Sequence, residues 1–295
     1  MGDAATIARA LGGARRAGRG WVARCPAHGD RNPSLSLTNG RDGRLLARCH
    51  AGCDWPVILD ALRALGLVEG MSDWRPPSRE ELVAQRAAEA QEKAKRAAQA
   101  QRCWDEARPA AGSLVERYLR GRGIKSPVPA VLRFHPECWH GPTARRFPAM
   151  IARVDGCKRF AVHRTYLTPE GRKAVVEPAK LSLGSVRGGA VRLYGAHRRL
   201  VVAEGIETAL SLASGLLDGQ ASVWAALSAP GMAALRLPPL PSAKAELVVA
   251  VDGDPTGRRA GRELAERATA AGWRVSMADP GDGQDFNDIL TEVAT

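Results

Sequence analysis

The stretch that decides the fold is ELVVAVDGDPTGRRAGRELAERATAAG, residues 246–272. It opens with an apolar run, continues with a turn rich in Gly and Asp, and ends with a segment of helical periodicity. We therefore expect a strand, a loop and a helix. Residues 200–217 repeat this order, and residues 222–229 and 273–280 predict further strands. Alternating strands and helices indicate a mostly parallel sheet, whose sites lie at the carboxyl ends of the strands.

Acidic residues stand at those strand ends. Glu204 follows LVVA, Asp252 and Asp254 follow LVVAV, and Asp285 lies beyond the last strand. Neighbouring parallel strands lie roughly 4.8 Å apart, so these carboxylates can converge if their strands are neighbours. Converging carboxylates repel unless a proton or a cation lies between them, and an all-oxygen cluster suits Mg²⁺ or Mn²⁺. The plainer alternative, that each acid caps a following helix, accounts for one or two of them.

Two close pairs of Cys and His residues stand near the start of the chain, as Cys25-Pro-Ala-His28 and as Cys49-His-Ala-Gly-Cys53. The first residues lack the order of a signal peptide, and cytosolic thiols stay reduced, so this spacing favours metal over disulfides. Three thiolates and one imidazole make a closed tetrahedral set for structural zinc. His50 is a rival for the fourth ligand, and four buried small residues without metal are the alternative.

The segment between the two pairs predicts a β-hairpin. Leu35 and Leu37 alternate with Ser, Asn39-Gly and Asp42-Gly give turn signals, and an apolar run follows. A small zinc-clipped sheet results, in which the metal contributes folding free energy. Residues 54–68 predict one amphipathic helix.

The charge of the chain points to a polyanionic partner. The 295 residues carry a formal net charge of +12, which favours nucleic acid, although a GC-rich coding bias would also enrich Arg, Ala and Gly. No run of eighteen apolar residues occurs, so we expect no membrane span. Residues 78–107 predict a charged connector helix. Residues 110–198 carry short strand patterns and many basic residues, which form either a groove for a nucleic-acid backbone or a scattered solvated face.

The motifs resemble a known family. An EG pair after one strand and DGDPTGRRAG after another resemble the Toprim domain of primases, topoisomerases and some nucleases. The DGDxxGxxAG form is similar to that of DnaG-type primases, which also carry an N-terminal zinc domain with a CPxH pair, a PSL strand and a second cysteine pair. The blocks RFHP, AVHRTYL, EPAKLSLG and DFNDIL resemble Toprim primases of phages, plasmids and integrated elements.

The expected fold is therefore α/β, and α+β overall. We expect a small zinc-ribbon-like domain at residues 1–70, a helical linker at 71–109, a mixed basic subdomain of the primase core at 110–198, and a Rossmann-like Toprim domain with a parallel sheet at 199–295.

The resemblance implies a DNA primase, a DNA-directed RNA polymerase that joins ribonucleotides into short primers on single-stranded DNA. Its zinc would be structural, and Mg²⁺ or Mn²⁺ would be the catalytic ion. Glu204 would be the acid/base or metal-adjacent carboxylate, Asp252 and Asp254 metal ligands, and Asp285 a further acidic position. The zinc module would recognise the template. The candidates for nucleotide or nucleic-acid contact are Arg164, Lys180 and Arg258, although Lys180 could equally be a plain surface lysine.

The chain departs from the DnaG pattern in several places. Thr208 stands where DnaG-type enzymes carry an Asp, with Glu207 one residue earlier, and Asn287 stands where a second late carboxylate is expected, beside Asp288. The second cysteine pair is Cys-x3-Cys. The roles of Glu207, Asn287 and Asp288 are therefore open.

Three other readings compete with the primase. A Toprim nuclease would use the same carboxylates to activate water, and a non-catalytic replication protein would only bind DNA. A topoisomerase needs a nucleophilic tyrosine on a large separate domain, and the chain is short with only Tyr118, Tyr166 and Tyr194. No Gly-x4-Gly-Lys-Ser/Thr phosphate loop is present, so a helicase partner would be a separate protein. We expect a cytoplasmic, nucleoid-associated protein.

Overall fold

The structure is a computed structural model, and two compact units divide the chain, Met1–Ala87 and Ala88–Thr295. The predicted break before the connector helix, at residues 71–77, lies outside the described residues. No helix in the described part of the chain is both long and apolar enough to cross a membrane. The structure describes residues 3–30, 32–40, 42–68, 79–195, 198–217, 219–240, 242 and 245–293.

The first unit contains a four-stranded antiparallel sheet in the order β1-β2-β3-β4. The predicted hairpin is confirmed, because β3 pairs with β4, and Leu35 and Leu37 of β3 are buried against Ile58 and Leu62 of α2. The strands β1 and β2 were not predicted, because their Arg- and Gly-rich sequence lacks apolar alternation. The elements are α1 (Ala4–Leu11), β1 (Arg15–Ala17), β2 (Gly20–Ala23), β3 (Leu35–Asn39), β4 (Leu45–Cys49) and α2 (Trp55–Ala64).

The helix α3 (Arg79–Glu106) covers the predicted connector. Its last turns are not solvated, since Ala100 and Trp104 are buried against the strands that follow. The expectation of a solvated connector therefore fails for the end of α3, where Trp104 supplies the apolar contact that the charged composition hides.

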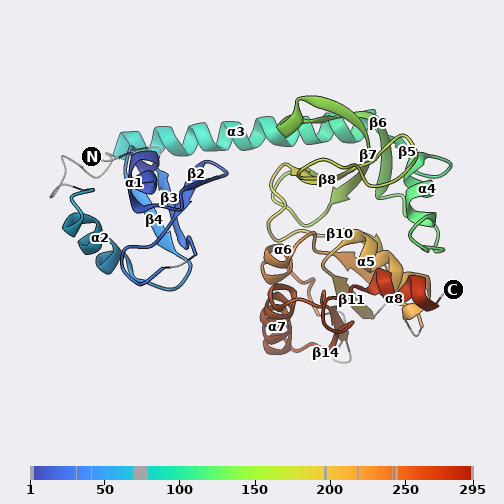
Figure 1. The fold of residues 1–295 in the computed structure, drawn as a ribbon. Coiled ribbons are helices and arrows are strands. Elements are labelled where there is room, and N and C mark those ends of the chain that lie inside the picture. The colour runs from blue at the N-terminus through green and yellow to red at the C-terminus, as the bar shows by residue number, and fades with distance from the viewer. Residues whose placement is uncertain are drawn as a thin grey trace. The chain divides into compact units, whose positions relative to one another are not determined.

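The middle of the chain forms an antiparallel sheet in the order β5-β6-β7-β8-β9, with α3 on one face (Figure 1). Val162 and Tyr166 of β8 pack on that face, while Ala161 and Leu167 join the core shared with the C-terminal sheet. One of the short strand patterns, at residues 173–183, forms a strand only over Lys180–Leu183, because Pro178 lacks the N–H that a strand ladder needs. The elements are β5 (Arg108–Pro109), α4 (Leu114–Arg120), β6 (Leu132–His140), β7 (Arg145–Val154), β8 (Ala161–Tyr166) and β9 (Lys180–Leu183).

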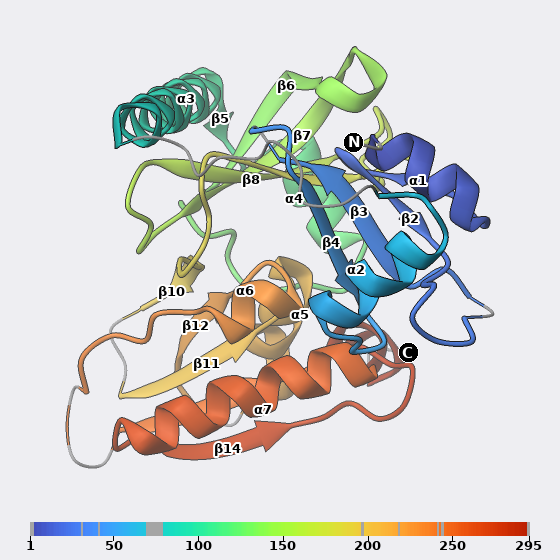
Figure 2. The same ribbon diagram turned by 90° about the vertical axis from the view of Figure 1, so that its left-hand side faces the viewer.

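The C-terminal sheet has the order β10-β12-β11-β13-β14. The predicted parallel sheet is confirmed for its four later strands, whereas β10 runs antiparallel to β12 at one edge. The helices α5 and α8 pack on one face, and α6 and α7 lie side by side on the other (Figure 2). The elements are β10 (Val191–Tyr194), β11 (Arg199–Ala203), α5 (Ile206–Ser211), a π-helical turn (Leu212–Leu216), β12 (Ser222–Ala225), α6 (Ala229–Ala233), β13 (Glu246–Ala250), α7 (Pro255–Ala270), β14 (Arg274–Ala278) and α8 (Phe286–Val293).

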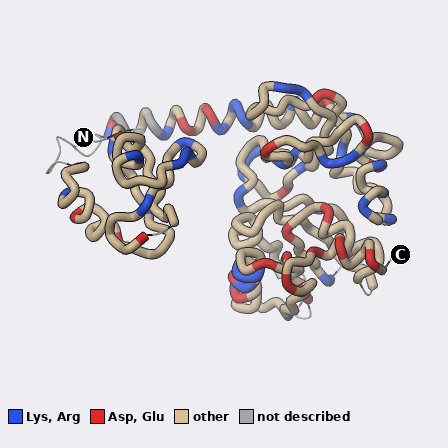
Figure 3. Tube along the Cα trace, viewed as in Figure 1, with Lys and Arg blue, Asp and Glu red and all other residues tan. Residues whose placement is uncertain are grey.

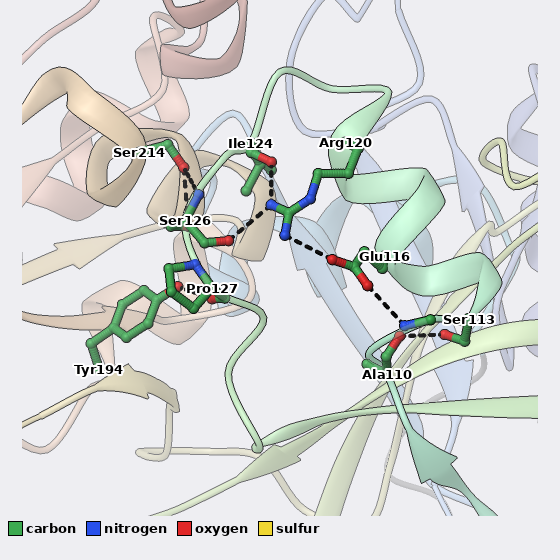
Figure 4. Close-up of polar contacts among 10 residues, drawn as sticks. Ala110, Ser113, Glu116, Arg120, Ile124, Ser126, Pro127, Tyr194 and Ser214 are labelled. Carbon is green, nitrogen blue, oxygen red and sulfur yellow. Dashed lines mark hydrogen bonds and ion pairs between the residues drawn. The ribbon is translucent and has the colours of Figure 1, made fainter.

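The loop after α4 ties the middle sheet to the C-terminal sheet (Figure 4). Arg120 donates from Nη1 to the carbonyl oxygens of Ile124 and Ser126, at 2.7 and 2.9 Å, which shapes the loop. The amide of Ser126 then donates to Ser214 Oγ at 3.2 Å, and Tyr194 of β10 donates to the Pro127 carbonyl. These bonds fix the two sheets relative to each other within the second unit.

Candidate metal centres and acidic site

The acidic residues lie where two strands end. The strands β11 and β13 are hydrogen-bonded neighbours in parallel register, with Ala203 opposite Ala250. Glu204 directly follows the first of these residues, and Asp252 lies two residues beyond the second. The carboxylates were expected to converge if their strands are neighbours, and these two strands are neighbours.

Glycines let the chain turn tightly beside these acids. A Cβ atom on Gly253 would lie 1.8 Å from the carbonyl oxygen of Gly281, and a Cβ on Gly261 would lie 2.2 Å from Val251 Cγ1. Real Cβ atoms do not come that close, so both positions require Gly. The first glycine brings the loop after β13 against the loop that leads to α8, and so places Asp252 near Asp285.

The acids raise one another's pKa values. Burial and the negative charges of Asp285 and Asp254 raise the pKa of Asp252. Burial and Asp252 likewise raise the pKa of Glu204 to about 7. The oxygen Oδ1 of Asp252 is buried and has no hydrogen-bond partner among the described residues. A buried, unpartnered carboxylate oxygen among repelling charges is the environment that a hard divalent cation relieves.

Two of the acids also cap helices. Asp254 Oδ1 accepts the amides of Thr256 and Gly257 at 2.7 and 2.8 Å, at the start of α7. Asp285 Oδ1 accepts the amides of Asn287 and Asp288 at 2.7 and 3.0 Å, at the start of α8. The capping alternative thus holds for these two residues, and each cap uses one oxygen of the carboxylate.

The carboxylates are near one another without forming a finished ligand set. In the described ranges, one group of three or more His, Cys, Asp or Glu side chains has all its ligand atoms within 4.8 Å of one another. That group is Cys25, His28, Cys49 and Cys53, and it contains none of these acids. Asp252, Asp254 and Asp285 would therefore have to move closer together to hold a divalent ion. Oxygen-only donors and the unpartnered Oδ1 fit Mg²⁺ or Mn²⁺.

The cysteine and histidine cluster is compact. His28 Nδ1 lies 3.2 Å from Cys53 Sγ and 3.9 Å from Cys49 Sγ. Burial and the neighbouring thiol of Cys49 raise the pKa of Cys25 to about 12, as expected for thiols packed together without a cation. Three sulfur donors and one imidazole nitrogen fit structural Zn²⁺, which displaces the thiol protons.

Neighbouring side chains decide which histidine belongs to this cluster. His50 lies outside it, because its Nε2 is 2.7 Å from Ser36 Oγ on the exposed side of the sheet. The buried carboxylate of Asp30 lies behind the cluster, with Oδ1 3.8 Å from His28 Nε2 and Oδ2 accepting the Cys25 amide at 2.8 Å. Asp30 thus orients two ligands, as carboxylates behind metal-bound histidines do. No motif in the sequence marks this role of Asp30.

Comparison with known proteins identifies the C-terminal part. Residues 199–295 match the Toprim domain family, from β11 to the end of the chain. This part of the chain is a Toprim domain. The resemblance inferred from the EG pair and the DGDPTGRRAG run is thereby confirmed.

The other comparisons concern the rest of the chain. Residues 94–193 match a domain of unknown function, DUF7146. The chain is similar to the zinc-binding and RNA polymerase domains of the Aquifex aeolicus primase, at 14% identity over 99% of this chain and 82% of that one, with a TM-score of 0.43. It is also similar to a DNA primase domain from Pseudomonas aeruginosa, at 18% identity over 68% and 74% of the two chains, with a TM-score of 0.40. No curated protein matches the sequence.

The basic candidates differ in their surroundings. Arg164 is buried on the face of the middle sheet beneath α3, where its Nη1 donates to the Trp139 carbonyl at 3.1 Å. This contact holds the Arg164 guanidinium within the fold, and its contact with nucleic acid stays a prediction. Arg258 of the Toprim domain binds the carboxylates of Asp279 and Asp282, which raise its pKa and already balance its charge.

Lys180 lies next to the acidic site. Its Nζ is 2.8 Å from Oε2 of Glu207, the first-turn acid of α5, and its charge offsets part of the rise that burial and neighbouring acids cause in the pKa values of Glu204 and Asp252. Tyr118 donates to the other oxygen of Glu207 at 2.8 Å. The sequence marked Lys180 as a candidate contact and left the role of Glu207 open, whereas the part played by Tyr118 appears only in the fold.

The late polar residues of the Toprim domain have structural roles. Asn287 is buried, and its Nδ2 donates to the Arg122 carbonyl at 2.7 Å and to Ser211 Oγ at 3.0 Å. Asp288 Oδ2 accepts the amide of Asp285 at 3.1 Å, which completes the start of α8. Asn287 therefore ties α8 to the rest of the second unit.

The raised pKa of Glu204 predicts a pH dependence of stability. The folded metal-free protein holds the Glu204 proton up to about pH 7, whereas an unfolded glutamate loses it near pH 4.5. The contribution of Glu204 to stability therefore falls as the pH rises between those values. We expect the melting temperature of Glu204→Gln to exceed that of the wild type by a margin that widens from pH 5 to pH 7.5. Saturating Mg²⁺ should reduce the margin, whereas the exposed control Glu263→Gln should show none, and a margin independent of pH would contradict the assignment.

Proposed function

We propose that the chain is a DNA primase, which makes short RNA primers on single-stranded DNA by metal-dependent nucleotidyl transfer. The observation that carries the proposal is the edge of the Toprim sheet, where Oδ1 of Asp252 is buried and has no hydrogen-bond partner among the described residues. Asp252 lies there among repelling acids, and the charge of Lys180 acts on it. The order of a Cys/His cluster followed by a Toprim domain supports a primase over other Toprim proteins.

The acidic site supplies the chemistry of the proposed reaction. Asp252 and Asp254, with Asp285 beside them, would hold Mg²⁺ or Mn²⁺, which neutralises the phosphates during phosphoryl transfer. Glu204, with a pKa of about 7, can accept a proton from the attacking 3′-hydroxyl near neutral pH. Lys180 would bind the phosphates of the incoming nucleotide.

Template binding is assigned to two surfaces. The zinc module would recognise single-stranded DNA, and exposed basic residues of the middle sheet would bind its backbone. Figure 3 shows Lys and Arg spread over the middle part of the second unit and acidic residues concentrated in the Toprim domain. A helicase partner and a cytoplasmic, nucleoid-associated location belong to the same proposal. The exposed basic residues of this part of the chain include Arg145, Arg146, Lys158, Arg159, Arg172 and Lys173.

Incubation of the protein with single-stranded DNA, ribonucleotides and Mg²⁺ or Mn²⁺ tests the function. We expect short RNA products, resolved on a denaturing gel, that depend on both the template and the divalent ion. Cut template without new strands would instead establish a nuclease. DNA binding with neither product, even when a replicative helicase is added, would point to a non-catalytic binding protein.

A further inference from the structure

We propose that Glu207 and Tyr118 are positioning residues, which hold the Lys180 ammonium at the edge of the acidic site so that it contacts nucleotide phosphates, and that Glu207 is not a metal ligand. This inference rests on the proposed function, because it takes a nucleoside triphosphate as the ligand of Lys180. It assigns a role to the glutamate that replaces the DnaG pattern at this point of the chain.

The contacts of Glu207 leave it unsuited to bind a metal. One oxygen accepts the Tyr118 hydroxyl and the other accepts the Lys180 ammonium, both at 2.8 Å, and the residue is only 5% exposed. Burial by itself would raise the pKa of Glu207, but the adjacent ammonium outweighs burial and lowers the pKa to about 2. A metal cation at this carboxylate would be repelled by the adjacent ammonium and would compete with the ammonium and the hydroxyl for the carboxylate's negative charge. The nearby oxygen that lacks such partners among the described residues is Oδ1 of Asp252.

In the ion pair of Glu207 and Lys180, the carboxylate is buried and the lysine side chain is partly exposed. The side chain of Glu207 is 6% exposed, whereas that of Lys180 is 37% exposed. An ammonium has three N–H donors, and the contact with Glu207 uses one of them. The remaining donors of Lys180 can therefore reach a ligand while the ion pair stays intact.

Three separate elements define where the ammonium lies. Lys180 begins β9 and pairs with Thr165 of β8, Tyr118 belongs to α4, and Glu207 belongs to α5 of the Toprim domain. The neighbouring His163 has its pKa lowered to about 4, by burial and then by Lys180, so it adds no positive charge near neutral pH. Within this group the ammonium supplies the positive charge.

The charge balance of the site favours a phosphate as its ligand. Glu204, Asp252, Asp254 and Asp285 gather negative charge at the sheet edge, and this charge repels a triphosphate in the absence of cations. Lys180 Nζ lies 2.8 Å from Oε2 of Glu207, three residues after Glu204, and its charge acts on both Glu204 and Asp252. Phosphates bound to the proposed divalent ion would therefore come within reach of the ammonium.

Two binding measurements on the full chain separate positioning from metal ligation. Mn²⁺ affinity is measured by electron paramagnetic resonance, and nucleotide affinity by titration of a fluorescent ATP analogue in the presence of Mn²⁺. We expect Lys180→Ala to weaken nucleotide binding by roughly 10- to 100-fold, the range for a lost hydrogen bond between charged groups. Glu207→Gln should weaken it by about tenfold and leave Mn²⁺ affinity unchanged, whereas Asp252→Asn should weaken Mn²⁺ binding.

Further variants keep the test decisive if a variant misfolds. Tyr118→Phe retains the ion pair and loses one hydrogen bond, so it should fold and weaken nucleotide binding a few-fold without changing Mn²⁺ affinity. The exposed controls Glu263→Gln and Lys95→Ala should match the wild type in both measurements. The double variant of Lys180 and Glu207 should bind nucleotide no more weakly than Lys180→Ala, because Glu207 acts through Lys180.

The results also separate this inference from the proposed function. Loss of Mn²⁺ binding in Glu207→Gln comparable to that in Asp252→Asn would overturn the inference, and so would unchanged nucleotide affinity in Lys180→Ala or in both Glu207→Gln and Tyr118→Phe. A wild-type protein that binds nucleotide as described yet makes no primers would overturn the primase function and support the positioning role. A wild-type protein that binds no nucleotide would overturn the inference itself.

Discussion

Replacing Asp252 by Asn is expected to abolish primer synthesis and to raise the melting temperature of the metal-free protein. The carboxylate is half-buried, repelled by Asp254 and Asp285, and carries an oxygen without a hydrogen-bond partner among the described residues. In the proposed reaction it holds the divalent ion, which stabilises the transition state by several kcal/mol, so the rate should fall by at least about a thousandfold. Removing a repelled charge should stabilise the fold, since a raised pKa means that folding disfavours the ionised form.

The two readouts must move in opposite directions for the assignment to hold. Primer synthesis is followed by nucleotide incorporation, and stability by thermal unfolding in a chelator that removes Mg²⁺. Asp105→Asn is the matched control, because Asp105 is exposed on α3 and accepts from Gln101, and an Asn oxygen can still accept that bond. A variant that loses activity together with stability would show a structural role for Asp252.

Removing the zinc is expected to unfold the first unit and to leave the Toprim domain folded. The small sheet of the first unit has a limited core, and structural zinc contributes an apparent binding free energy of about 10–16 kcal/mol in small zinc domains near pH 7. Cys53→Ala should have the same effect as a chelator, because it removes a ligand that lies 3.2 Å from His28 Nδ1. The second unit keeps its own core and should retain its protection.

Hydrogen exchange resolved by segment, together with the zinc content of the purified protein, measures this effect. Residues 3–68 should lose protection in the variant while residues 199–293 keep it. Cys157→Ser is the control, since Cys157 lies outside the cluster and should leave both the zinc content and the exchange pattern unchanged. Full protection of the first unit after complete loss of zinc would refute the structural role of the metal.

Local patterns predicted the framework of the fold. Apolar runs followed by amphipathic segments marked the parallel strands and their helices, and the acids after LVVA and LVVAV marked the edge that β11 and β13 share. The turn signals between Leu37 and Leu45 marked the hairpin of the first unit. Each of these features depends on neighbours in sequence, which is why periodicity and turn chemistry revealed them.

Contacts between distant residues could not be predicted in this way. Glu207 meets Tyr118 across 89 positions and Lys180 across 27, and the alternation along β8 that buries Arg164 beneath α3 depends on where that helix packs. Asp30 belongs to none of the sequence motifs, and its place behind His28 appears only in the fold. Such contacts follow from tertiary packing. Patterns among neighbouring residues of one sequence do not show which distant residues will meet.

The antiparallel strand β10 sets a practical limit on how the chain can be divided. The family match begins at residue 199, but β12 pairs with β11 on one side and with β10, Val191–Tyr194, on the other. A fragment that starts at the family boundary would leave β12 with an exposed row of amide and carbonyl groups, which invites pairing between molecules and aggregation. An expression fragment of the Toprim domain should therefore begin before Val191, so that β10 remains as the edge strand beside β12.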